Sequence, residues 1–230
     1  MLPKQPLEFY NEALAGVDRD ELQGKLIVIE GPDSVGRSTQ GARLRTWLEH
    51  KGHAVMDTGL ARGALAGKGI QQAKEGNTLG PITMTLFYAT DFADRLENEI
   101  IPALRAGFVV LTDRYIFSLM ARAIARNEDR SWIEKVAGFA LVPHATYYLR
   151  ADVRDLLTRV VLGRGAFDYW ESGMDMRFGA DMHDSFVRYQ TRVIRALDRM
   201  AKRYDFEVLD ANKTPDQIFR ELRRSIAKLF

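Results

Sequence analysis

The sequence predicts an α/β protein built on a doubly wound parallel sheet. Five short apolar runs, several rich in β-branched residues, alternate with amphipathic segments of helical length. Apolar runs without polar alternation are typical of strands that are buried on both faces. Strands that alternate with helices favour parallel pairing through helical crossovers. A glycine-rich turn between the first run and the first helical segment is also typical of this fold class.

The first apolar run gives the clearest strand signal. It reads Lys25-Leu26-Ile27-Val28-Ile29-Glu30 and ends at Gly31 and Pro32. The expected strands are 25–30, 53–56, 108–111, 145–149 and 206–209, of which 53–56 is the weakest. The expected helices are 38–50, 82–106, 118–139, 151–162, 183–204 and 215–229, and residues 127–130 are a possible break in the third. A proline at 102 predicts a kink or break in the second helix, because it lacks a backbone N–H.

The chain divides into three parts by sequence character. Residues 1–24 precede the first strand and are expected to form an appended helical extension, and residues 25–230 form the main domain. Within that domain, residues 163–181 are rich in glycine and aromatic residues and are interpreted as a flexible insertion.

Composition excludes several functional classes. The net charge of +2 gives no reason to expect a nucleic-acid partner, and no apolar stretch is long enough to span a membrane. The absence of cysteine excludes disulfides, thiolate metal sites and a cysteine nucleophile. The four histidines are scattered without metal-ligand spacing. Together with an N-terminus that lacks a signal-peptide pattern, these features favour a cytoplasmic protein.

Residues 31–39 form a candidate phosphate-binding loop. They read Gly-Pro-Asp-Ser-Val-Gly-Arg-Ser-Thr and match the pattern G-x-x-x-x-G-K-[ST], except that Arg37 replaces lysine. In this motif, backbone N–H groups and a helix N-terminus bind phosphate oxygens, and the hydroxyl after the cation binds Mg²⁺. The expected phosphate-binding residues are Gly31, Ser34, Val35, Gly36, Arg37, Ser38 and Thr39. Arginine keeps the charge but is longer and planar. Nucleotide binding without turnover is therefore one alternative function.

From about residue 25 to the C-terminus, the chain resembles the thymidylate kinase family. Residues 30–40 are similar to the family motif E-G-x-D-x-x-G-K-S-T-Q, and residues 100–118 to I-x-P-x-L-x-x-G…D-R-Y-x-x-S. The resemblance implies a P-loop kinase three-layer fold with a five-stranded parallel sheet flanked by helices. It also implies transfer of the ATP γ-phosphate to dTMP to give dTDP, with Mg²⁺, and a homodimer.

The resemblance assigns roles to residues near the acceptor nucleotide. Asp33 is similar to the loop carboxylate that meets the sugar hydroxyl, and Arg114 to the cation that holds the acceptor phosphate. Asp113 is similar to the acid near Mg²⁺ at the end of a central strand, so Ser38 and Asp113 are the expected metal ligands. Phosphoryl transfer depends on positioning and charge neutralisation, which suits these residue types.

The segment of about 159–181 is similar to the family's lid. Its arginines Arg159 and Arg164 fit the family pattern of cations that close over the phosphates, where they would stabilise transition-state charge. Residues 209–211 resemble the family's closing strand and the loop near the adenine. The expected catalytic residues are Arg37, Asp113, Arg159 and Arg164.

The chain departs from the family pattern on the acceptor side. The family's E-P-G turn is replaced by residues 57–63, Asp-Thr-Gly-Leu-Ala-Arg-Gly, and Phe92 stands where the arginine of F-x-A-D-R is expected. Arg95, about one turn later, is the candidate for reading the base, and Phe87 or Tyr88 for stacking on it. A same-fold kinase with another acceptor, either a different nucleotide or a small phosphorylated metabolite, is therefore the second alternative.

Overall fold

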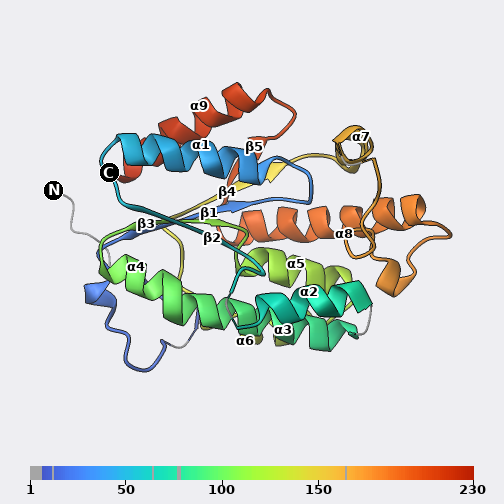
Figure 1. The fold of residues 1–230 in the computed structure, drawn as a ribbon, viewed down its shortest axis with the longest axis horizontal. Helices are drawn as coiled ribbons and strands as arrows, with labels where there is room; N and C mark the ends of the chain where they lie inside the picture. The colour runs from blue at the N-terminus through green and yellow to red at the C-terminus, as the bar shows by residue number, and fades with distance from the viewer. Residues whose placement is uncertain (1–6, 12, 64, 77–78, 164) are drawn as a thin grey trace.

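A parallel sheet of five strands forms the centre of the protein, as the computed structural model shows (Figure 1). The structure describes residues 7–11, 13–63, 65–76, 79–163 and 165–230. The strands are β1 (Lys25–Glu30), β2 (Val55–Gly59), β3 (Val109–Asp113), β4 (Ala145–Arg150) and β5 (Glu207–Asp210). Their order in the sheet is β2-β3-β1-β4-β5, and every pairing is parallel. The predicted fold class and all five expected strands are confirmed.

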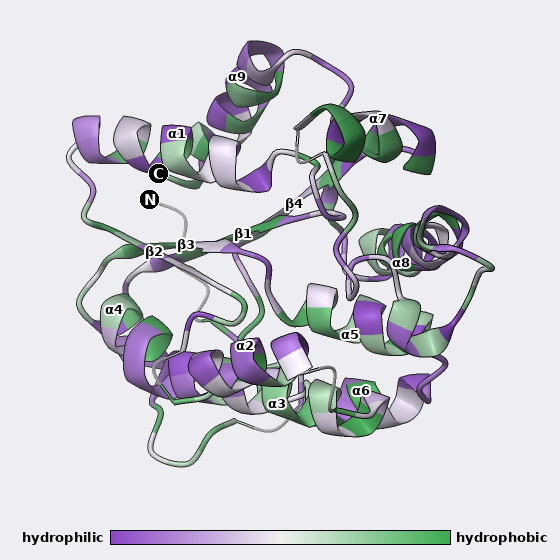
Figure 2. Cartoon of the chain, turned by 45° about the vertical axis from the view of Figure 1, so that its right-hand side comes forward, coloured by the Kyte–Doolittle hydropathy of each residue, from purple (hydrophilic) through white to green (hydrophobic). Residues whose placement is uncertain are grey.

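Helices cover both faces of the sheet. They are α1 (Arg37–His50), α2 (Gly67–Gly76), α3 (Pro81–Arg95), α4 (Ile101–Arg105), α5 (Ile116–Ala125), α6 (Arg130–Val136), α7 (Val153–Gly163), α8 (Met182–Arg203) and α9 (Pro215–Ile226). Successive side chains of β1 enter opposite cores, because strand side chains alternate between faces. Leu26 and Val28 pack with α3, α4 and α5, whereas Ile27 and Ile29 pack with α1, α7 and α9. The central strands are accordingly green in Figure 2, and the helices carry both colours.

Two helical segments are interrupted close to where the sequence predicts a break. The expected helix 118–139 is the pair α5 and α6, separated at residues 126–129. The irregularity expected near Pro102 is a π-helical turn at Leu96–Ile100 that joins α3 to α4. Its wider hydrogen-bonding pattern accommodates a proline that cannot donate a backbone hydrogen bond. Helix α2 was not predicted, because it is rich in glycine and buries only Ile70.

The expected N-terminal helix is wrong for the described part of residues 1–24. Residues 7–11 run antiparallel to residues 138–142, with hydrogen bonds from Tyr10 N to Ala140 O and from Val142 N to Glu8 O. Gly16 adopts a left-handed conformation that a helix would not accept, and only a short 3-10 turn follows at Arg19–Glu21. Buried Leu7 and Leu22 anchor the segment to the core beneath the sheet.

No helix in the described part of the chain is long and apolar enough to cross a bilayer.

Candidate active site

The loop that follows β1 lies where the sheet reverses its winding. From β1 the chain crosses to β2 on one side of the sheet, whereas β4 lies on the other side of β1. Open α/β sheets bind ligands at the carboxyl ends of strands beside such a point. Ile29 of β1 pairs with Asp113 of β3, so the loop after β1 and the residues after β3 are neighbours.

Glycine is required at both ends of this loop. Gly31 has φ 154°, and a Cβ there would lie 2.7 Å from the carbonyl oxygen of Leu149. Gly36 has φ 99° and caps the N-terminus of α1 in a left-handed conformation. These conformations turn the loop tightly into α1, whose N-terminal N–H groups and positive dipole end suit an anion.

The guanidinium of Arg37 lies across this loop. Its Nε donates to Asp113 Oδ1 at 2.7 Å, and its Nη1 donates to the carbonyl oxygens of Gly31, at 2.6 Å, and Pro32. The Ser38 hydroxyl donates to Asp113 Oδ2 at 2.7 Å. The structure thus brings together three of the predicted residues: the loop cation and the two expected metal ligands.

The chemistry of this donor set suits Mg²⁺. Burial raises the pKa of Asp113, but the Arg37 charge and the Ser38 hydrogen bond lead the effects that outweigh it, so the pKa is lowered. A carboxylate and a hydroxyl, completed by substrate phosphates, are typical ligands of Mg²⁺. Among the described residues no cluster of three His, Cys, Asp or Glu forms a ready-made metal site. A metal here would therefore depend on the nucleotide for most of its ligands.

Buried Glu30 shapes the turn after β3. It accepts hydrogen bonds from Tyr115 N at 2.8 Å, Ser118 N at 3.2 Å and Ser118 Oγ at 2.6 Å. Between β3 and α5, Arg114 has φ 73°, a conformation that is strained for a residue with a side chain. Thr112 Oγ1 donates to the Arg114 carbonyl at 2.7 Å and stabilises this turn. The contacts point Arg114 toward the phosphate loop, where it forms an ion pair with Asp33.

Asp33 is shared by two arginines. Besides the pair with Arg114, Nη2 of Arg122 donates to both Asp33 carboxylate oxygens at 3.1 and 3.2 Å. Burial raises the pKa of Asp33, but the two guanidinium groups outweigh burial and hold the pKa well below its usual range. Burial, followed by the charge of Arg37, lowers the pKa of Arg114 to about 10. All of these groups remain charged at neutral pH, so the site carries fixed charge before any ligand binds.

A narrow cavity continues from Arg122 away from the phosphate loop. Its lining residues are Lys74, Met84, Tyr88, Arg122, Arg126, Trp170, Glu171 and Tyr189. It adjoins a cleft of about 440 Å³ between α2 and residues 168–170. The Trp170 indole N–H donates to the carbonyl of Lys74 at 2.8 Å and so joins the two walls of the cleft.

Comparison with known proteins identifies this arrangement. A family model described as thymidylate kinase matches residues 29–222, which is most of the chain. The chain belongs to the thymidylate kinase family. It is similar to "Probable thymidylate kinase 2" of Saccharolobus solfataricus, with 32% identity over 208 residues that cover 90% of this chain and 97% of that protein. It is also similar to "Thymidylate kinase" of Clavibacter sepedonicus, with 34% identity over 209 residues that cover 88% and 94%.

Arg122 is the main site residue that sequence reasoning missed in this thymidylate kinase family member. Ser118, Arg122 and Arg126 recur every four residues, which places them on one face of α5. Ser118 belongs to the motif that the sequence identified, so this spacing was a usable signal. The family motif that the chain resembles ends at Ser118, however, four residues before Arg122.

Two of the predicted base-contacting residues point elsewhere. Phe87 packs toward α2, where a Cβ on Gly69 would lie 3.3 Å from its ring. Arg95 is fully buried and donates through Nε to Asp91 at 3.1 Å. Asp91 also accepts hydrogen bonds from Ala61 N and Gly63 N at 2.8 Å, so the pair supports the loop after β2. Of the predicted base-contacting residues, Tyr88 alone lines the narrow cavity as the structure describes it.

The predicted lid arginines have different outcomes. Arg159 donates through Nη1 to Val35 O at 3.1 Å and through Nη2 to Ala211 O at 2.6 Å. It therefore connects the phosphate loop with the loop after β5 that resembles the family's adenine loop. Arg164 lies outside the described residues. The remainder of the predicted flexible insertion forms turns and a 3-10 helix at Met174–Met176.

Proposed function

We propose that the protein transfers the γ-phosphate of ATP to dTMP and releases ADP and dTDP. The observation that carries this proposal is the position of Arg114, which a strained turn and an ion pair with Asp33 hold beside the phosphate loop. A cation there can bind the phosphate of an acceptor while the loop holds the phosphates of the donor. The names of the relatives support dTMP as the acceptor.

Donor binding uses the loop and its cation. The N–H groups of residues 34–39 and the N-terminus of α1 would bind the β- and γ-phosphates, with the Arg37 guanidinium beside them. Ser38 and Asp113 would hold Mg²⁺ together with phosphate oxygens, and the ion would neutralise charge on the donor. Arg159, which donates to the carbonyls of Val35 and Ala211, would fix the distance between the phosphate loop and the loop after β5.

The chemical step needs positioning more than proton transfer. An acceptor phosphate oxygen forms a bond to the γ-phosphorus as the bond to the bridging oxygen breaks, and that oxygen leaves on ADP. The acceptor phosphate is already ionised at neutral pH, so no side chain has to remove a proton. Arg114 and Arg37 would stabilise the charge that spreads over the transferring group.

The decisive experiment is an ADP-release assay with ATP and Mg²⁺, in which dTMP, dUMP, UMP, CMP, AMP and GMP are offered separately. We expect selective turnover of dTMP. The matched variant Arg114→Gln should lose most of kcat/KM for dTMP while its affinity for ATP stays near that of the wild type. Turnover of another acceptor alone would point to a different kinase of the same fold. ATP binding without any turnover would point to a nucleotide-binding protein.

We also propose a homodimer through the outer face of α3. Ile82 and Leu86 on this helix are exposed, and Leu65, in the loop between β2 and α2, is 73% exposed. Exposed apolar side chains of this size favour burial in an interface. Light scattering coupled to gel filtration should give twice the chain mass of 26.1 kDa. The double variant Ile82→Lys/Leu86→Lys should give the monomer mass.

A further inference from the structure

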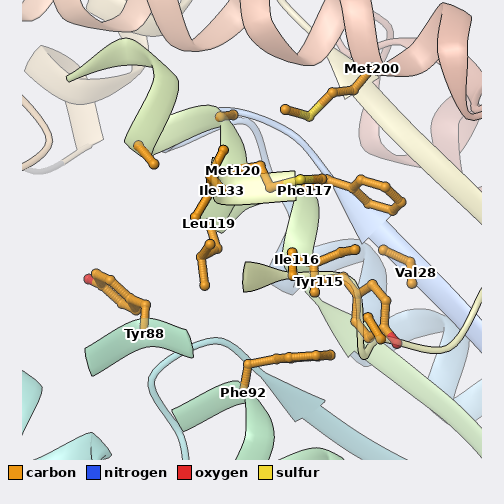
Figure 3. Packing of buried hydrophobic residues seen from close by; sticks show 14 of the residues in the cluster. Val28, Tyr88, Phe92, Tyr115, Ile116, Phe117, Leu119, Met120, Ile133 and Met200 are labelled. Atoms are coloured by element: carbon orange, nitrogen blue, oxygen red, sulfur yellow. The ribbon is translucent and has the colours of Figure 1, made fainter. Parts of the chain in front are cut away.

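Among the described residues, helix α3 contributes Met84 and Tyr88 to the cavity beside Asp33, and no arginine. Phe92 occupies the position where the family pattern has an arginine, and its ring lies edge-on to Tyr115 at 4.9 Å and near Phe139 at 5.5 Å. Figure 3 shows Phe92 pointing toward Tyr115, whereas Tyr88 leaves α3 in another direction. Arg95 is fully buried and does not line the cavity: its Nε pairs with Asp91, and its Nη1 and Nη2 have no hydrogen-bond partner among the described residues. The position that family members use to read the base has become part of the hydrophobic core.

The facing helix α5 and its C-cap place two arginines, Arg122 and Arg126, on the same cavity instead. Arg126 is engaged with the segment after α7: it donates to both carboxylate oxygens of Asp175 at 2.8 and 3.1 Å and to the Trp170 carbonyl at 3.1 Å. Arg122 pairs with Asp33 through Nη2. Among the described residues, no hydrogen bond is found from the Nε or Nη1 of Arg122. Two of the three guanidinium nitrogens of Arg122, a residue that lines the cavity, are therefore without a hydrogen bond to the described residues.

The position of Arg122 along the site is equally specific. Its Cζ lies 6.0 Å from the centroid of the Tyr88 ring, and both residues line the narrow cavity. Contacts join these residues in a chain: Arg114 pairs with Asp33 of the phosphate loop, Asp33 pairs with Arg122, and Arg122 lies against the Tyr88 ring. A nucleotide with its phosphate on Arg114 and its sugar near Asp33 would place its base at Tyr88, where the narrow cavity opens into the cleft of about 440 Å³, with the Arg122 guanidinium beside it.

We propose that Arg122 reads the base of the acceptor nucleotide by donating a hydrogen bond to the ring carbonyl that thymine and uracil carry where cytosine carries an amino group. This inference rests on the proposed function, since it assumes an acceptor nucleotide in this cavity. Arg122 thereby supplies from α5 the guanidinium that other family members supply from the helix corresponding to α3.

The chemistry of arginine determines the direction of the selectivity. A guanidinium has only donors, so it satisfies a carbonyl oxygen and opposes an amino group. Burial lowers the pKa of Arg122, but the charge of Asp33 leads several effects that outweigh burial and raise it. Arg122 therefore stays a donor throughout the physiological range. A buried charged donor that loses its acceptor is left unsatisfied, which discriminates strongly against the wrong base.

The test compares kcat/KM for dTMP, dUMP and dCMP in the wild type and in Arg122→Gln. We expect the wild type to prefer dTMP and dUMP over dCMP, and the variant to reduce the dTMP-to-dCMP ratio by about 10- to 100-fold, as expected for loss of one hydrogen bond to a charged group. Arg192→Gln is the matched control. Arg192 lies on α8, stacks on Phe178 at 4.3 Å and donates to Asn127, and its replacement should leave the ratio unchanged.

Other outcomes separate this inference from the proposed function. Equal losses of kcat/KM for all three acceptors would mean that Arg122 acts only through Asp33 or the phosphate, which would overturn the inference and leave the proposed function intact. If Arg122→Gln does not fold, Arg122→Lys keeps the charge beside Asp33 but loses the planar fork, and its ratio should fall as well.

Equilibrium binding to the wild type needs no variant. Calorimetric titration should show dTMP binding at least about 10-fold more tightly than dCMP, which corresponds to the lower end of the expected hydrogen-bond effect. Equal affinities would overturn the inference. Selective dTMP binding in a protein without turnover would overturn the proposed function while supporting the role of Arg122.

Discussion

Replacing Arg126 by methionine removes the cation that holds residues 170–175 against α5 and α8. Arg126 and Asp175 are 7% and 11% exposed and are joined by two hydrogen bonds at 2.8 and 3.1 Å. Arg126 also donates to the Tyr189 hydroxyl and the Trp170 carbonyl. Removing one partner of such a buried pair costs about 3–5 kcal/mol, because the other charge stays buried without compensation. For a chain of this length, the expected fall in Tm is on the order of 10 °C.

Urea denaturation of four proteins measures this effect. Asp175→Asn and the double variant complete a cycle with the wild type and Arg126→Met, and the double variant should recover at least about 1 kcal/mol relative to the sum of the single changes. Arg130→Met is the control, because Arg130 pairs with Glu134 on the surface of α6, where a pair contributes less than about 1 kcal/mol. A loss of stability in Arg126→Met no larger than in Arg130→Met would refute the reasoning.

Three further changes test the phosphate loop and its charges. Arg37→Met should lower kcat by about 100-fold or more, because it removes the cation that we propose lies beside the transferring phosphate. A kcat equal to that of the wild type in a steady-state assay would contradict this role. Gly31→Ala should abolish ATP binding in a calorimetric titration, since its Cβ would meet the Leu149 carbonyl oxygen at 2.7 Å. Asp33→Asn should lower stability at neutral pH. The pKa of Asp33 is depressed in the folded state, so this carboxylate stabilises the fold above its unfolded pKa of about 3.9. The stability difference from the wild type should therefore be constant above about pH 5 and shrink as the pH falls below about 4, and a difference that grows with acid would contradict this assignment.

Local pattern was sufficient to predict the sheet. Each strand is a compact apolar run, and burial on both faces leaves little ambiguity about its type. The N-terminal segment was predicted wrongly because its mixed composition suits a helix, whereas its hydrogen bonds come from residues 138–142, which are distant in sequence. Helix α2 escaped prediction for a related reason: contacts with α3 and the segment near Trp170 stabilise a glycine-rich sequence that has little intrinsic helix propensity.

The sequence likewise predicts the part of the site that lies in contiguous motifs, but not the part that the fold assembles from distant segments. The phosphate loop and the Asp113-Arg114 pair are contiguous motifs, so the sequence locates them directly. The cavity beside Tyr88 is assembled from α2, α3, α5, α8 and residues 170–171, and no single stretch of sequence contains its pattern. Arg95 illustrates the difficulty, because its spacing of four residues from Asp91 suits either a surface ion pair or a ligand contact. Only the packing of α3 on the loop after β2 shows that the pair is buried.

The hydrogen bonds of Arg159 affect how much conformational entropy the two loops of the expected donor site would lose when ATP binds. One guanidinium bonds to Val35 in the phosphate loop and to Ala211 beyond β5, so both ends of the expected donor site share a single brace. Contacts within the chain thus set the spacing between the triphosphate and adenine ends of that site. Two loops that are already fixed relative to each other lose little conformational entropy on binding, so more of the contact free energy remains as affinity. Folding would then fix the distance between the phosphate and adenine ends of the donor site, and a donor nucleotide would bind best when its length matches that distance.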